Sequence, residues 1–113
     1  MKRQLASIMF AFCAGLHAHG HSEELRVGSK RFTESYILGE IITQAAARAG
    51  EATASHRQGL GNTGIVFAAL KSGAIDLYPD YTGTIAKEIL KIDGPFDLAL
   101  LNTRLAAEGL SVA

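Results

Sequence analysis

Apolar residues recur every three or four positions between residues 33 and 50, which predicts an amphipathic helix. The recurring positions are Ile37, Leu38, Ile41, Ile42, Ala45 and Ala49. Thr33 is a typical helix cap, because its hydroxyl accepts a hydrogen bond from a first-turn amide, and Gly50 suits the position after the last turn. Just before this helix, residues 25–28 alternate briefly and predict a strand that ends at a glycine.

The middle of the chain repeats this order of strand and helix. Residues 52–58 predict a second strand, although it has no large apolar residue. The glycine-rich "GLGNTG", residues 59–64, then opens a second helix, capped by Asn62 or Thr63 and ended by Gly73. The apolar positions of this helix are Ile65, Val66, Ala69 and Leu70.

The last third predicts one more strand and two helices. "AIDLYP", residues 74–79, is expected to be a strand that ends at Pro79, since proline donates no hydrogen bond to a sheet. Residues 82–92 predict a helix with Thr82 or Thr84 as its cap, and residues 96–109 have the period of a final helix. The order β-α-β-α-β-α-α favours an α/β fold with a mostly parallel sheet and flanking helices.

Three loops follow the carboxyl ends of the predicted strands, where ligands bind in sheets of this kind. They are "SKRFTE" (residues 29–34), "GLGNT" (residues 59–63) and "YPDYTGT" (residues 78–84). In the third loop, Tyr81 is expected to leave the sheet and stand at the crevice. The negative π-face of its ring would attract a quaternary ammonium by about 0.5–2 kcal/mol.

The first twenty residues read as a signal peptide. Lys2 and Arg3 precede an uncharged apolar run over residues 5–16, which is shorter than the roughly 20 residues that span a bilayer. We place cleavage after Gly20, which leaves residues 21–113 as the mature chain. The removal of Cys13 then excludes any disulfide, and the chain is expected to be exported, to the periplasm or cell envelope.

Composition excludes several classes of function. The 113 residues suffice for one domain, and equal numbers of acidic and basic residues give no global attraction to nucleic acid. Without Lys2 and Arg3, nine basic residues face eleven acidic ones. The histidines His17, His19 and His21 straddle the predicted cleavage site without carboxylate or thiolate support, so no metal site and no cofactor are predicted.

Enzyme chemistry is not expected either. "GLGNTG" formally matches a GxGxxG spacing, but it follows no apolar strand and lacks the Lys-Ser/Thr of a phosphate-binding loop. His56 is interpreted as a histidine at a solvated strand end, and the serines show no nucleophile motif. Asp76 and Asp80 are expected to point in different directions rather than act as an acid–base pair.

Three ordered motifs resemble the substrate-binding proteins of ABC importers for glycine betaine, choline, carnitine and related osmoprotectants. They are "VGSKRFTESYILGEI" (residues 27–41), "GLGNTGIVFAALKSGAIDLYP" (residues 59–79) and "DYTGT" (residues 80–84). The resemblance implies a type II periplasmic-binding-protein lobe from a two-lobed receptor that passes its ligand to a membrane permease. It implies an aromatic cage residue at Tyr81 and further ligand-binding positions at Thr63 and Thr33, while Tyr78 and Tyr36 are expected to be packing residues.

Two departures qualify the resemblance. Asn62 stands where relatives often carry a smaller residue, which puts the loop contact in question. The length suits only the N-terminal part of a first lobe, so an isolated chain is expected to bind its ligand weakly or not at all. The alternative interpretation is a small exported α/β interaction module without a small-molecule site.

Overall fold

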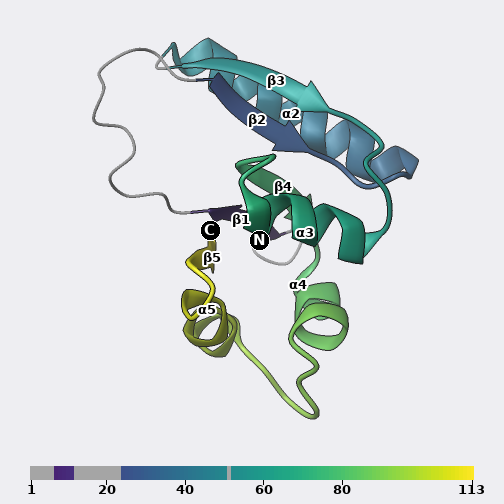
Figure 1. Cartoon of the computed structure of the whole chain (residues 1–113), viewed down its shortest axis with the longest axis vertical. Coiled ribbons are helices and arrows are strands. Elements are labelled where there is room, and N and C mark those ends of the chain that lie inside the picture. Colours follow the sequence, from purple (N-terminus) through teal and green to yellow (C-terminus); the bar gives the residue numbers. More distant parts are fainter. Residues whose placement is uncertain (1–6, 12–23, 51) are drawn as a thin grey trace.

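The computed structural model describes residues 7–11, 24–50 and 52–113 (Figure 1). Its elements are β1 (Ser7–Ala11), β2 (Glu24–Gly28), α2 (Thr33–Ala49), β3 (Thr53–Arg57), α3 (Thr63–Ser72), β4 (Leu77–Asp80), α4 (Thr82–Thr84), the π-helix η2 (Ile85–Ile89), α5 (Leu98–Ala106) and β5 (Leu110–Val112). The fold is an α/β lobe with helices flanking one sheet, as predicted.

The sheet has the strand order β3-β2-β4-β1-β5. The three predicted strands pair in parallel, with β2 between β3 and β4. The other two strands, β1 and β5, were not predicted, and β1 runs antiparallel to both of its neighbours. In Figure 1, β2 and β3 lie along α2, whereas α3 lies over β4.

Helix α2 ends at Gly50 as predicted, but it begins differently. The cap is Phe32, and Thr33 is the first helical residue with no capping hydrogen bond from its side chain, so the predicted threonine cap is wrong. Two of the recurring apolar residues, Ile37 and Ile41, are 54% and 58% exposed. The buried residues of the helix are Ser35, Gly39 and Thr43, whose small side chains let α2 approach the sheet closely.

Strand β4 continues through Pro79, so the prediction that the proline ends the strand is wrong. Pro79 lies opposite Ile8 of β1, and Asp80 is the last strand residue. Proline lacks only the N–H and keeps its carbonyl acceptor, so pairing continues past it. The strand also begins later than predicted, because the amides of Ala74 and Ile75 donate to Ala69 at the end of α3.

The segment after β4 is shorter and more irregular than the single predicted helix. One turn of α4 passes directly into η2. Tyr81 is the cap of α4, whereas Thr84 precedes η2 and its side chain makes no capping hydrogen bond. The final helix α5 is capped by Asp97, whose side chain accepts from the amide of Leu100 at 2.9 Å.

The hydrophobic core is built from residues of α3, η2, α5, β4 and β5 and of the segments next to them. Its buried members are Val66, Leu70, Ile75, Tyr78, Ile85, Ala86, Ile92, Leu101, Leu105, Leu110 and Val112. None of the helices within the described ranges is both long and apolar enough to cross a membrane.

Candidate ligand-binding site

The loops that follow β2, β3 and β4 meet at one edge of the sheet, as the parallel strand order predicts. Lys30, two residues after β2, connects them. Its ammonium donates to Asp80 Oδ1 at the end of β4 at 2.8 Å and to Thr63 Oγ1 at the start of α3 at 3.1 Å. The side chain of Lys30 is 9% exposed and that of Asp80 is fully buried, so this ion pair belongs to the interior.

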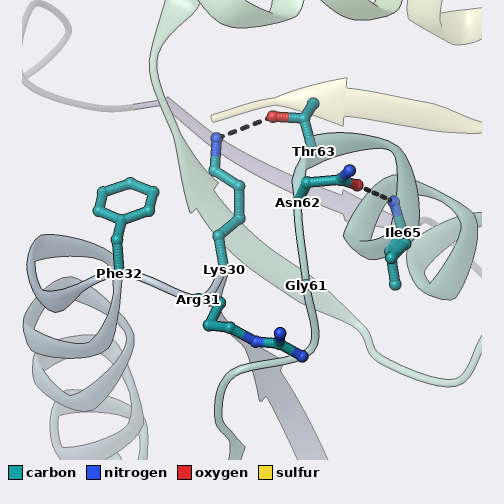
Figure 2. Close-up of a pocket in the computed structure, with 7 residues that line it drawn as sticks. All are labelled: Lys30, Arg31, Phe32, Gly61, Asn62, Thr63 and Ile65. Atoms are coloured by element: carbon teal, nitrogen blue, oxygen red, sulfur yellow. Dashed lines mark hydrogen bonds between the residues drawn. The ribbon is translucent and has the colours of Figure 1, made fainter.

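A pocket of about 440 Å³ opens beside this ammonium. It is lined by Lys30, Arg31, Phe32, Gly61, Asn62, Thr63 and Ile65. Figure 2 shows Lys30 extending between Phe32 and the loop that carries Thr63, whereas Arg31 points away from Lys30. The lining is therefore mixed: two cationic residues, polar groups of the α3 cap and two apolar side chains.

The two loops that line the pocket are held together through their backbones. The amide of Arg31 donates to the carbonyl of Gly61 at 3.0 Å. Gly61 has φ 146°, and a Cβ at this position would lie 2.8 Å from Ile65 Cδ1. Asn62 then caps α3 by accepting from the amide of Ile65 at 3.1 Å, which confirms one of the two predicted caps.

Tyr81 lies at the surface rather than in the core. Its hydroxyl donates to the carboxylate of Glu34 in the first turn of α2, and its amide donates to Asp80 Oδ1 at 2.8 Å. The hydrogen bond to Glu34 raises the pKa of Tyr81 to about 12. The ring is thus tied to the first loop, with a carboxylate beside it.

The structure brings two of the three predicted site residues into one network. Thr63 lines the pocket and accepts from Lys30, and Tyr81 joins the same network through Asp80. Tyr81 itself is not among the residues that line the pocket, and neither is Thr33, which is exposed at the start of α2. Asn62, whose ligand contact the resemblance put in question, acts as the cap of α3.

Lys30 and Phe32 are the site residues that the sequence analysis missed. Both stand in the "SKRF" loop at the carboxyl end of the first strand, which is where the parallel-sheet rule already placed a ligand site. The Lys30 ammonium lies 5.5 Å from the centre of the Phe32 ring. A lysine and an aromatic residue in such a loop were the available signal.

Behind the site lie two buried polar atoms without a hydrogen-bond partner among the described residues. They are the Tyr78 hydroxyl and Asp80 Oδ2. Burial, and then the neighbouring Asp80 carboxylate, raises the pKa of Tyr78. Tyr78 is fully buried and belongs to the core cluster, which confirms its predicted packing role.

His56 was predicted to lie at a solvated strand end, and this is wrong. Its side chain is 5% exposed, and its ring nitrogens bond to Glu40 Oε1 at 2.9 Å and to Ser29 Oγ at 2.8 Å. A Cβ on Gly39 would lie 2.5 Å from the ring, so the glycine makes room for the imidazole. The acidic–imidazole–hydroxyl order is that of a hydrolase, but Ser29 is fully buried, so this hydroxyl is not accessible to a substrate.

Asp76, just before β4, and Asp80, at its end, have separate partners. Asp76 accepts from the backbone and the guanidinium of Arg26, with an ion-pair distance of 3.0 Å, whereas Asp80 binds Lys30. In the part of the chain that the structure describes, no cluster of His, Cys, Asp and Glu is suited to hold a metal ion. His17, His19 and His21, and the predicted cleavage site, lie outside the described residues.

A sheet whose parallel strands deliver two loops to one pocket, with the end of a third strand joined to them by an ion pair, is the architecture of a ligand-binding lobe. The sequence profile of the substrate binding domain of the ABC-type glycine betaine transport system matches residues 23–112. The chain belongs to this family of substrate-binding domains.

Two curated relatives extend the comparison. The chain is similar to the glycine-betaine-binding protein of Pseudomonas aeruginosa PAO1, with 39% identity over 102 residues, which are 88% of this chain and 32% of that protein. It is also similar to the glycine betaine-binding protein YehZ of Escherichia coli K12, with 46% identity over 59 residues, 52% of this chain and 19% of the relative. The chain therefore spans a third or less of either relative.

Proposed function

We propose that this chain forms part of the first lobe of an exported, non-enzymatic receptor that binds a quaternary-ammonium osmolyte and delivers it to an ABC importer permease. The observation that carries the proposal is the pocket at which Lys30 joins the three loops, in a chain of the glycine betaine family. Glycine betaine, choline and carnitine are the ligands to be compared.

The site has two ends of opposite character, which suits a ligand with separated charges. At one end, Tyr81 presents a ring with the Glu34 carboxylate beside it, and both attract a methylated ammonium. At the other end, Lys30 uses two of its three N–H donors on Asp80 and Thr63, which leaves one donor for a ligand carboxylate. The start of α3 adds the positive end of a helix dipole.

We propose that the chain is exported, because residues 1–20 read as a signal peptide. The family profile begins to match at residue 23, shortly after the proposed cleavage site. A receptor that acts outside the cytoplasmic membrane would need such a leader. Secretion tests this step: in a cell with an active export pathway, the N-terminal residue of the secreted chain should lie close to residue 21.

Ligand binding is best tested in a two-lobed protein, because one lobe alone leaves the ligand half exposed to water. Residues 23–112 would replace the matching segment of the Pseudomonas aeruginosa relative, and calorimetry would measure glycine betaine and choline binding. Tyr81→Ala is expected to weaken binding about 2- to 30-fold, the equivalent of one cation–π contact. Tyr81→Phe keeps the ring and should retain most of the affinity.

The control is Ile41→Ala, on the exposed face of α2 and outside the pocket, which should bind as the parent does. Unchanged affinity in Tyr81→Ala would exclude the cation–π role of this ring. Absence of any osmolyte binding in the parent would instead favour an exported interaction module. The isolated 113-residue chain should bind much more weakly than the two-lobed protein.

A further inference from the structure

A buried imidazole lies directly behind the loop that carries Lys30. The side chain of His56, near the end of β3, is 5% exposed. Its Nδ1 lies 2.9 Å from Glu40 Oε1 in α2, and its Nε2 lies 2.8 Å from Ser29 Oγ. Ser29 is fully buried and is the residue immediately before Lys30. The imidazole is not among the residues that line the pocket, so it acts on the site through Ser29.

The Glu40 carboxylate decides which ring nitrogen of His56 carries the proton. Hydrogen bonds from Gln44 and then from His56 lower the pKa of Glu40, so this carboxyl group is ionised at neutral pH and only accepts hydrogen bonds. In the neutral ring, Nδ1 therefore carries the hydrogen that points at Glu40, and Nε2 is left as an acceptor. The Ser29 hydroxyl then donates to Nε2, which fixes the direction of this side chain.

Ser29 is held at three points, and Lys30 follows it directly. The amide of Ser29 donates to the carbonyl of Arg57 at 3.2 Å, and its carbonyl accepts from the amide of Leu60 at 3.0 Å. The hydrogen bond from its hydroxyl to the imidazole is the third point. The amide of Lys30 itself donates to Ser35 Oγ in α2 at 2.7 Å. The backbone from which the Lys30 side chain starts is thus fixed both towards β3 and towards α2.

The position of this backbone determines where the remaining donor of Lys30 points. Two N–H groups of the ammonium are used by Asp80 and Thr63, and the third is available to a ligand carboxylate. Hydrogen bonds weaken steeply when donor and acceptor are misaligned. A small shift of the loop would therefore weaken the contact to a carboxylate first. The aromatic end is less affected, because Tyr81 is tied to Glu34 and Asp80.

We propose that His56 is a positioning residue for the carboxylate end of the site and thereby sets a preference for ligands that carry a carboxylate. It acts on Lys30 through the Ser29 hydroxyl, while Glu40 holds the ring in the required tautomer. The inference rests on the proposed osmolyte-binding function. Its consequence is an effect on glycine betaine, which has a carboxylate, without an equal effect on choline, which has none.

Ser29→Ala tests this link, because it deletes the hydroxyl and leaves the imidazole in the chain. In the two-lobed protein described above, calorimetry should show glycine betaine binding weakened about 3- to 10-fold, which is part of the value of one hydrogen bond to a charged group. Choline binding should change by less than about twofold. The matched control is Thr43→Val, which removes another buried hydroxyl, one that donates to the Gly39 carbonyl at 2.8 Å. It should leave the ratio of the two affinities unchanged, whatever its effect on stability.

Substitutions of Glu40 give a second test at a side chain that is 47% exposed, where the core tolerates change. Glu40→Gln keeps an oxygen that accepts from Nδ1 and should retain the parent's ratio of glycine betaine to choline affinity. Glu40→Ala releases the ring and should lower this ratio by about twofold or more, in the same direction as Ser29→Ala. Equal ratios in Glu40→Ala and the parent would contradict the role of the tautomer.

A measurement without ligand separates this inference from the proposed function. In the full 113-residue chain, the two partners of the Lys30 ammonium should protect its NMR signal from exchange with water. Ser29→Ala should shift or broaden this signal, and Thr43→Val should not. If the parent does not bind glycine betaine, the proposed function fails, and the Lys30 signal alone decides whether the imidazole positions this side chain. Equal losses of affinity for both ligands in Ser29→Ala, or an unchanged Lys30 signal, would overturn the positioning role.

Discussion

The substitution Lys30→Met should destabilise the lobe strongly, because it leaves the Asp80 carboxylate buried without a counter-ion. The ammonium lies 2.8 Å from Asp80 Oδ1, and the Asp80 side chain has no exposed surface. After the substitution, one described donor still reaches that oxygen, the amide of Tyr81 at 2.8 Å. A single neutral N–H does not replace a cation beside a buried carboxylate.

The expected size follows from this distance. Two unit charges 2.8 Å apart attract each other by about 6 kcal/mol at an effective dielectric constant of about 20. Desolvation of both ions cancels much of this attraction in the parent, but Lys30→Met removes the attraction and leaves the desolvated carboxylate. The loss of unfolding free energy should therefore be about 3–5 kcal/mol.

Urea denaturation, followed by circular dichroism, measures this loss in the full chain. The double variant Lys30→Met with Asp80→Asn removes both charges and keeps the shape of the second side chain. It should be more stable than Lys30→Met alone by about 1–3 kcal/mol, the usual coupling of residues in direct contact. The reasoning is refuted if Lys30→Met costs under about 0.5 kcal/mol, or if the double variant is no more stable than Lys30→Met alone.

Three further predictions follow from burial and from the position of single groups. Gly39→Ala should cost about 1–3 kcal/mol of unfolding free energy, because the new methyl group would displace the imidazole beside it. Leu101→Ala should cost about 2–5 kcal/mol, since this side chain is fully buried, whereas Ile41→Ala on the exposed face of α2 should cost under about 0.5 kcal/mol. Glu34→Gln should lower the pKa of Tyr81 from about 12 towards the ordinary value of 10.0, measured as tyrosinate absorbance during an alkaline titration.

Each of these predictions has a control, and the last one also fixes the direction in which stability changes with pH. Gly64→Ala, in α3 and with no atom closer than 3.7 Å to its new methyl group, should stabilise the chain, so equal losses at Gly39 and Gly64 would contradict the steric reason. Equal losses for Leu101→Ala and Ile41→Ala would contradict the burial pattern. The folded-state pKa of Tyr81 lies above its unfolded value, so this hydroxyl contributes stability that is complete below pH 10 and is lost as the pH rises towards 12. An unchanged pKa in Glu34→Gln would contradict the hydrogen bond.

Periodicity predicted the elements whose signal is local. The helix at residues 33–50 and the strands before and after it formed where the pattern placed them, because caps, glycine stops and alternation act within a few residues. The errors lie at boundaries that neighbours decide. Phe32 replaced Thr33 as the cap, and β4 continued through Pro79 because β1 lies along it.

The candidate site was also predictable from the sequence only in part. Residue types and loop positions were enough to select Thr63 and Tyr81 as candidates. The role of Lys30 was not visible, because its two partners stand 33 and 50 positions away along the chain. The network of Ser29, His56 and Glu40 was missed for the same reason, since its members are 27 and 16 positions apart.

The sequence by itself determined that this chain forms an α/β lobe with its loops gathered at one sheet edge, because strand direction follows from the order of elements. Only the tertiary structure decided which charges meet in the interior and which strand lies between β4 and β5. Ion pairing and sheet pairing join residues that are distant in the sequence, and no local pattern records such partners.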